Sequence, residues 1–201
     1  TKFEESLEIA IKLGIDSSKT DQNIRGTINL PKGTGKKVRV AVVAKGEKVD
    51  EALNAGADIV GEAEISDKVS SGKIDFDILI STPDMMSSIS KLAKILGPKG
   101  LMPNPKLGTV TQDIQTAIKN AKAGQIQYKN DKGGIVHAGV GKLKFSDEDL
   151  IENLKTFYSS INKSKPDSIK GTFIKKVTIA STMGVGLQIN ATSLRWMEFN
   201  R

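Results

Sequence analysis

The stretch VRVAVVAKGEKVDEALNAGADIV, at residues 38–60, decides the fold class of this chain. Its first seven residues, 38–44, are almost entirely apolar, as in a strand that is buried on both faces. Residues 49–55 repeat apolar side chains at helical spacing, and residues 58–60 predict a short second strand. The order strand, helix, strand indicates parallel strands connected by a helix.

The same alternation of helices and strands continues beyond residue 60. Three further elements are predicted: a short helix at residues 65–71, a strand at residues 76–81 and a helix at residues 84–96. Residues 113–122 predict one more helix, which Gly124 ends. Alternating elements of this size indicate a parallel sheet with helices on both faces, here over residues 36–124.

The two ends of the chain carry a different pattern. Residues 3–13 alternate apolar and polar side chains, which is the period of a strand with one buried face. Residues 147–161 predict an amphipathic helix that Ser146 caps. Further strands are predicted at residues 25–30, 125–130, 135–142, 172–180 and 187–190, with residues 131–134 joining two of them as a hairpin.

These patterns divide the chain into two domains. We expect residues 1–35 and 125–201 to form one split α+β domain, into which residues 36–124 are inserted. Of the net charge of +7, residues 125–201 carry +5, because they hold 12 Lys and Arg against 7 Asp and Glu. A basic partner-binding surface is therefore expected on the split domain.

The amino-acid composition limits the kinds of reaction and binding that the chain can perform. The 201 residues include 30 Lys and Arg against 23 Asp and Glu, with a pI near 9.4, no cysteine and a single histidine, His137. Disulfides, thiolate chemistry, structural zinc and most nucleophile–histidine pairs are excluded. No apolar run reaches the roughly 20 residues that span a bilayer, and no secretory signal is expected after Thr1. A basic chain of this kind is typical of a nucleic-acid partner, although the charge could serve only solubility.

Known cofactor motifs do not occur. The GTGK at residues 33–36 resembles the end of a phosphate-binding loop, but the earlier Gly and the following Ser or Thr are missing. No G-x-G-x-x-G follows the strand at residues 38–44. We therefore expect no cofactor, no metal and no catalytic residues. The loop GPKGLMPNPKLGT, at residues 97–109, holds three prolines, and a stiff loop carrying Lys99 and Lys106 favours contact with a partner.

Four separated motifs in one order resemble the ribosomal protein L1 family of the bacterial type. They are GPKGLMPNPKLGTV at residues 97–110, NDKGGIVH at 130–137, SSKTDQNIRG at 17–26 and STMG at 181–184. The resemblance covers almost the whole chain. It implies that the split domain binds the L1 stalk of large-subunit ribosomal RNA and that the inserted domain is a Rossmann-like three-layer α/β domain.

The resemblance also implies partners and a place in the cell. Members are monomers within the large ribosomal subunit, assist movement and release of deacylated transfer RNA from the E site, and commonly repress translation of their own operon messenger RNA. The expected location is the cytoplasmic ribosome, with an organelle matrix as the alternative. No membrane is involved.

The residues expected to contact RNA gather at the first strand and the last turn. The resemblance implies Lys2, Phe3, Ser6 and the turn Ser181, Thr182, Met183 and Gly184. Hydroxyls and amides of this turn would meet 2′-hydroxyls and phosphates, and Gly184 would allow a positive φ if the turn needs one. Lys142, Lys175 and Lys176 would attract phosphates, and His137 either touches a phosphate or is an ordinary half-exposed strand residue. Lys99 and Lys106 are expected to face transfer RNA or the other domain.

Two competing functions remain open at this point. A small-molecule-binding or catalytic protein would use the crevice at the carboxyl ends of the inserted sheet, with Asp58, Asp77 or Asp84 as acids. A protein-interaction scaffold would have no RNA role. The glycine-bearing crossings at residues 33–37 and 123–125 predict a hinge between the domains.

Overall fold

The computed structural model describes residues 1–72, 74–169 and 171–190. The chain forms two compact units: unit 1 consists of Thr1–Lys36 together with the chain from Gly124 onward, and unit 2 of Lys37–Ala123. This division falls one residue away from each boundary expected from the sequence. Both units combine helices with strands, so the α/β class is confirmed.

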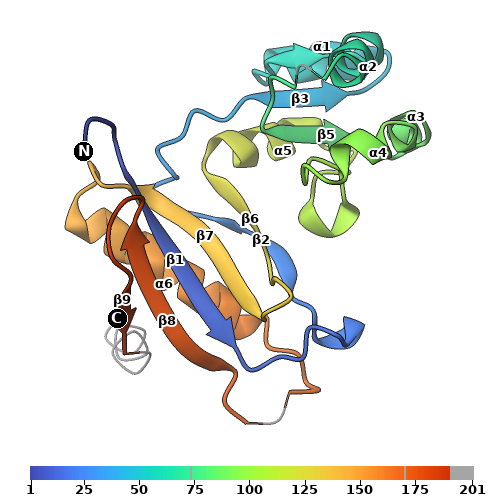
Figure 1. The fold of residues 1–201 in the computed structure, drawn as a ribbon. Helices are drawn as coiled ribbons and strands as arrows, with labels where there is room; N and C mark the ends of the chain where they lie inside the picture. The colour runs from blue at the N-terminus through green and yellow to red at the C-terminus, as the bar shows by residue number, and fades with distance from the viewer. Residues whose placement is uncertain (73, 170, 191–201) are drawn as a thin grey trace. The chain divides into compact units, whose positions relative to one another are not determined.

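Unit 2 is built on a parallel sheet of three strands in the order β4-β3-β5. The strands are β3 (Val40–Val43), β4 (Ile59–Val60) and β5 (Ile78–Ser81) (Figure 1). The helices are α1 (Glu47–Asn54), α2 (Glu62–Ser70), α3 (Met86–Ser90), α4 (Ala93–Leu96) and α5 (Ile114–Lys122). Val40 and Val42 pack with α1 and α5, whereas Ala41 and Val43 pack with α2, α3 and α4. Because strand side chains alternate, helices bury both faces of the sheet.

The single helix expected over residues 84–96 is wrong. A 3₁₀ turn at Pro83–Met85 leads into α3, and α4 follows after a break. The Ser90 hydroxyl at the end of α3 donates to the Met86 carbonyl at 2.7 Å. At the break itself, the Lys91 and Leu92 amides donate to carbonyls three residues back, those of Ser88 and Ile89, so the α-helical ladder is interrupted there. The second helix also begins earlier than expected, directly after Gly61.

The proline-rich loop at residues 97–109 is tied back onto the sheet. The Ser81 amide donates to the Thr109 carbonyl at 2.9 Å, and the Thr111 amide donates to the Ser81 carbonyl at 3.1 Å, so Val110 lies beside β5 as a parallel bridge. The buried Thr109 hydroxyl accepts the Asn104 amide at 2.8 Å. The loop is therefore an ordered part of unit 2.

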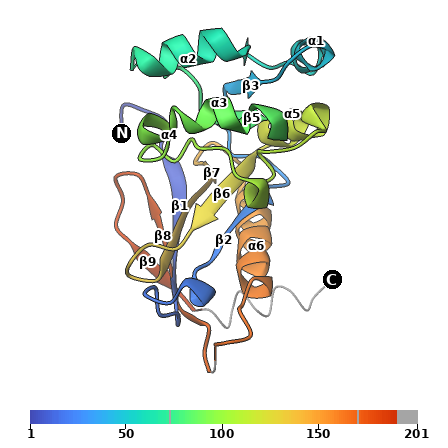
Figure 2. The ribbon, with the colours of Figure 1, turned by 90° about the vertical axis from the view of Figure 1, so that its right-hand side faces the viewer.

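Unit 1 contains an antiparallel sheet in the order β7-β1-β8-β9. The strands are β1 (Ser6–Leu13), β7 (Ile135–Lys142), β8 (Ile174–Ser181) and β9 (Leu187–Ile189). Helix α6 (Asp147–Lys163) lies along one side of this sheet (Figure 2). It begins as expected at Ser146, whose hydroxyl accepts the Asp149 amide at 3.2 Å. The alternating side chains Ile9, Ile11 and Leu13 of β1 join the core with α6.

The hairpin expected between residues 125–130 and 135–142 is wrong in its pairing. Strand β6 (Gln125–Lys129) pairs along its whole length with β2 (Arg25–Asn29), and one bridge, Asn130 to Val136, connects it to β7. The Asn130 side chain accepts the Ile24 amide at 2.7 Å. This contact fixes β6 next to β2, and the two form a separate ribbon.

The segments that lead to and from unit 2 lie against each other within unit 1. The Leu30 amide donates to the Gly124 carbonyl at 3.3 Å. Gly124 has φ +101°, and a Cβ placed there would lie 2.3 Å from the Gly33 Cα. Only glycine permits this backbone conformation together with so close an approach.

Asn153 of α6 binds the outgoing segment as well. This fully buried side chain accepts the Lys32 amide at 3.1 Å and donates to the carbonyls of Gly33 at 2.9 Å and Val140 at 2.8 Å. A Cβ at Gly35 would meet Lys142 and Phe145. Gly33 and Gly35, which belong to one of the two crossings where a hinge is predicted, are thus also packed within unit 1.

Candidate nucleic-acid interface

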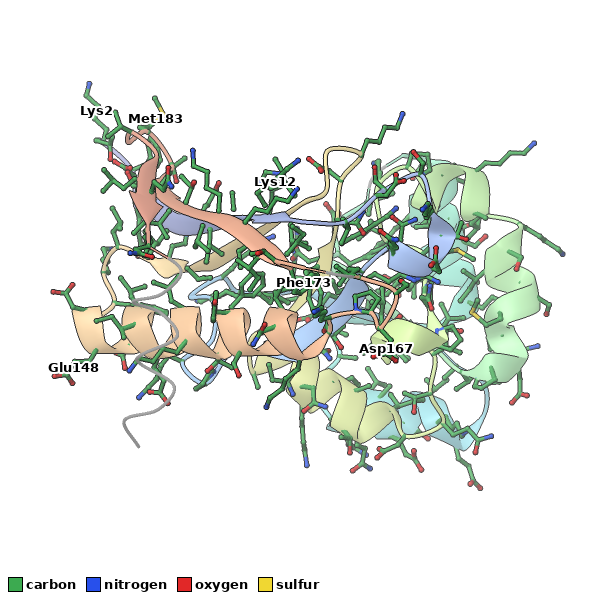
Figure 3. All side chains as sticks on the ribbon, turned by 90° about the horizontal axis from the view of Figure 1, so that it is seen from below. Lys2, Lys12, Glu148, Asp167, Phe173 and Met183 are labelled. Atoms are coloured by element: carbon green, nitrogen blue, oxygen red, sulfur yellow. The ribbon has the colours of Figure 1, made fainter. Side chains whose placement is uncertain are left out.

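One face of the four-stranded sheet carries α6, and the other carries polar and charged side chains. The even-numbered residues of β1 point to this second face, which we call the open face. Figure 3 shows Lys12 on the side away from α6, and Lys2 with Met183 close together at one end of the sheet. Apart from His137, the predicted RNA contacts of unit 1 fall into two groups on or beside this face.

The first group, which we call the turn end, consists of residues 2–6, Lys142 and residues 181–185. The Ser6 amide donates to the Thr182 hydroxyl oxygen at 3.0 Å, and the Met183 amide donates to Glu5 Oε2 at 3.2 Å. The ammonium group of Lys142 donates to the Ser6 hydroxyl at 2.8 Å. The structure therefore brings together residues at both ends of the sequence, as expected.

Two residues of the turn have contacts within the protein that the sequence does not show. The Thr182 hydroxyl also donates to the Ser6 carbonyl at 3.4 Å, so this side chain ties the turn to β1. Gly184 is not in the positive-φ region, and a Cβ there would lie 2.5 Å from the Ser181 hydroxyl oxygen. A side chain at this position would therefore displace the Ser181 hydroxyl.

Glu5 holds the turn end together and was missed at the sequence level. Hydrogen bonds from the Thr1 hydroxyl, the Ser181 hydroxyl and the Met183 amide lower the pKa of Glu5 from 4.5 to about 2. Each of these donors favours the ionised carboxylate. An acidic residue among other exposed polar residues has no periodicity that would have singled it out.

The low pKa of Glu5 makes the turn sensitive to acid. A carboxylate whose pKa is lowered by folding stabilises the folded turn above pH 4.5, and this contribution is lost as the pH falls toward 2. We expect the Met183 amide resonance to shift with a midpoint near pH 2 in an NMR titration. A midpoint near 4.5 would contradict the bond between Glu5 and Met183.

Large apolar side chains are exposed at the turn end. The exposed fractions are 53% for Phe3, 70% for Met183 and 79% for Val185, and Leu187, which follows the turn end in β9, is 59% exposed. The alternative that Met183 merely fills the core is therefore wrong. Exposed apolar side chains grouped at one end of a sheet are typical of a surface that packs against a partner.

The second group, the lysine end, consists of Lys12, Lys132, Lys175 and Lys176. Lys12 pairs with Lys176 across β1 and β8, and a β-bulge beside this pair leaves both Lys175 and Lys176 exposed. Lys12 donates to the Gly133 carbonyl, which places Lys132 of the same turn nearby. No carboxylate pairs with these lysines among the described residues.

The two groups are separate. Ser6 begins β1, and Lys12 lies six residues along it, a span of about 20 Å at the rise of an extended strand. Lys142 therefore belongs to the turn end, whereas Lys175 and Lys176 lie at the other end of the sheet. Between them, His137 is opposite Ala10, is 62% exposed and places Nε2 3.5 Å from Asp131 Oδ2.

The ribbon of β2 and β6 presents a further basic pair, which sequence reasoning missed. Arg25 lies directly opposite Lys129, and both are exposed. Like charges in directly opposed positions destabilise a strand pair. No carboxylate pairs with either residue in the part of the chain that the structure describes, so an anionic partner would relieve this repulsion. Only the register of two strands distant in sequence reveals the pair.

The acids proposed for a catalytic crevice do not lie together. Asp58 accepts the Val40 amide at 2.9 Å and Asp77 accepts the Arg39 amide at 3.0 Å, so both sit at the amino edge of the sheet of unit 2. The bond from Val40 lowers the pKa of Asp58, and Lys122 at 3.3 Å lowers it further. Asp84 follows β5 at the carboxyl edge, where a crevice would lie.

The remaining observations concern metal ligands, membrane-spanning helices and the two lysines of the proline-rich loop. Within residues 1–72, 74–169 and 171–190, no three acidic or histidine side chains are grouped as metal ligands. Across the same ranges, no helix is long and apolar enough to cross a membrane. Lys99 is exposed on the proline-rich loop, while the side chain of Lys106 lies outside the described part of the structure.

Comparison with known proteins matches nearly the whole chain to one family. Residues 1–185 match the model of the ribosomal protein L1p/L10e family. The chain is 58% identical over 193 residues to proteins named large ribosomal subunit protein uL1 from Rickettsia canadensis, Rickettsia conorii and Rickettsia typhi. Each alignment covers 96% of this chain and 81% of the relative.

Proposed function

Because this chain belongs to the ribosomal protein L1 family, of the bacterial type, we propose that it is a constituent of the large ribosomal subunit that binds the L1 stalk of ribosomal RNA. The observation that supports this most directly is the open face of unit 1, with exposed Phe3 and Met183 at the turn end and, at the lysine end, lysines that pair with no carboxylate of the described residues. Aromatic and apolar side chains suit sugars and bases, and lysines suit phosphates.

The two units have different roles in this proposal. Unit 1 is the split RNA-binding domain, and unit 2 is an inserted Rossmann-like domain with no catalytic function. The protein acts as a monomer on the ribosome of the cytoplasm. Its open face would also bind the messenger RNA of its own operon and repress translation.

Transfer RNA leaving the E site is the second proposed partner. Two basic features outside the open face would serve it: the Arg25–Lys129 pair, and the proline-rich loop with Lys99 and Lys106. The loop is held by the Asn104–Thr109 bonds, so its lysines would be presented with little loss of entropy.

The proposal is tested by titrating the protein with a stalk fragment of large-subunit ribosomal RNA over a series of salt concentrations. Replacing Lys175 and Lys176 together by alanine removes two phosphate contacts. We expect the slope of log K against log salt to become shallower by about 2, roughly 1 per lysine. The measurement is the binding constant at each salt concentration.

A matched control uses Lys155→Ala with Lys163→Ala on α6, which covers the opposite face of the sheet. This pair should leave the slope nearly unchanged, and an equal change in both pairs would argue against the open face. Residues 37–123 alone should bind the fragment no better than an unrelated RNA. Specific binding by that piece would contradict the assignment of the two units.

A further inference from the structure

The ribbon of β2 and β6 has one apolar and one polar face. Ile28 and Tyr128 are buried in the core of unit 1, where Tyr128 meets Phe157 of α6 edge to face with ring centroids 6.1 Å apart. Because strand side chains alternate, the opposite face carries the other three cross-strand pairs, which are Arg25 with Lys129, Thr27 with Gln127 and Asn29 with Gln125. We call this surface the polar face of the ribbon.

The polar face is not used within the protein. None of its six side chains makes a hydrogen bond or an ion pair with the residues that the structure describes, and all six are exposed or half-buried. Arg25 and Lys129 supply two cations at one end of the ribbon, and no carboxylate belongs to the face. The other four side chains are three amides and one hydroxyl, which can both donate and accept.

These properties favour a nucleic acid over a protein as the partner. None of the large apolar side chains that are exposed in the described structure belongs to β2 or β6, whereas the centre of a protein–protein interface is rich in apolar and aromatic side chains. Arg25 and Lys129 repel each other across the ribbon. A phosphate group placed beside them would be attracted by both.

The minor groove of an RNA double helix has the shape and the chemistry that this face requires. It is wide and shallow and displays 2′-hydroxyls and base edges, whereas the major groove of A-form RNA is too narrow for side chains to read. Two-stranded ribbons enter nucleic-acid grooves. The face extends about 13 Å from Arg25 to Asn29, so its amides can contact 2′-hydroxyls while its cations contact phosphates at the border of the groove.

We propose that the polar face of the ribbon binds the minor groove of a double-helical arm of transfer RNA, with Arg25 and Lys129 on phosphates and Gln127 on a 2′-hydroxyl. The inference rests on the proposed function, in which transfer RNA is the second partner. Base edges in a minor groove differ little from one sequence to another. The same contacts can therefore serve transfer RNAs of different sequence, which favours transfer RNA over the stalk as the occupant.

The test measures binding of labelled transfer RNA to protein that is already saturated with the stalk fragment. Arg25→Ala with Lys129→Ala should weaken this binding and make the slope of log K against log salt shallower by about 2. Gln127→Ala should weaken it about fivefold with an unchanged slope, because it removes a hydrogen bond and no charge. Asn162→Ala is the matched control, since Asn162 is an exposed amide on α6, and it should leave the affinity within about twofold.

A second measurement uses only the wild-type protein. A short RNA duplex should compete with transfer RNA for the protein saturated with the stalk fragment. A DNA duplex of the same sequence should compete about tenfold less well, because it lacks 2′-hydroxyls and its minor groove is narrow. Equal competition by the two duplexes would overturn the assignment of the minor groove.

The outcomes separate the inference from the function on which it rests. Transfer RNA that binds the wild-type protein and the ribbon variants equally well would overturn the inference and leave the proposed function standing. An equal loss of affinity for the stalk fragment in the ribbon variants would overturn the choice of transfer RNA as the occupant. Failure of transfer RNA to bind the wild-type protein with its stalk fragment would overturn the second proposed partner itself.

Discussion

Replacing Gly124 with alanine is expected to lower the free energy of unfolding of unit 1 by about 3 kcal/mol or more. The new Cβ would lie 2.3 Å from the Gly33 Cα and 3.2 Å from the Thr34 amide nitrogen, and the backbone has φ +101°. Backbone atoms cannot rotate away as a side chain can, so the segments would have to separate. Hydrogen exchange of the Ile9 and Ile11 amides in β1 measures the change.

Gly171 provides the control for conformational strain alone. It has φ +96°, close to that of Gly124, but a Cβ there would meet nothing within 4 Å. Gly171→Ala should therefore cost only about 1–2 kcal/mol. Equal losses in the two variants would show that the close approach to Gly33 contributes nothing.

Replacing Asn153 with leucine should lower the free energy of unfolding of unit 1 by about 3 kcal/mol. Leucine has a similar size, but it leaves the Lys32 amide and the Gly33 and Val140 carbonyls without their partner. Buried backbone groups that lose a hydrogen bond keep the full cost of leaving water. Urea unfolding and the exchange of the Ile9 amide report the loss.

Asn162→Leu on the same helix is the matched control, because Asn162 is exposed. That variant should change stability by about 0.5 kcal/mol or less. A similar loss in both variants would mean that leucine disturbs α6 itself, and the three bonds of Asn153 would then not explain the effect.

Local patterns were sufficient for the elements that bury one face. The period of two in β1, the apolar spacing of α6 and the cap at Ser146 each lie within a short stretch of sequence. The buried strand β3 could likewise be identified from its continuous apolar run. In these cases the pattern of residues close in sequence already shows which side chains are buried in the folded protein.

The features that were missed depend on residues far apart in the sequence. Strand β6 looked like half of a hairpin, because nothing nearby shows that Asn130 would hold it to Ile24. Pairing partners and side-chain bonds of this kind appear only after the chain has folded.

The candidate site, too, could be predicted from the sequence only in part. The family motif located the turn from Ser181 to Gly184, but its direction of hydrogen bonding follows from Glu5 at the other end of the chain. The β-bulge that exposes Lys175 together with Lys176 interrupts the period from which one of them would be expected to be buried.

The position of β1 between β7 and β8 has a consequence for synthesis of the protein. During synthesis, Leu13 at the end of β1 emerges from the ribosome about 120 residues before Ile135. Ile135 is the first residue of β7, which pairs with β1. At roughly 5–20 residues per second, β1 waits on the order of 10 s without a partner. Unit 2 is continuous in sequence and can fold during this interval, whereas Ile9, Ile11 and Leu13 stay exposed. A nascent chain of this protein therefore passes through a period in which an unpaired apolar strand is open to chaperones or to aggregation.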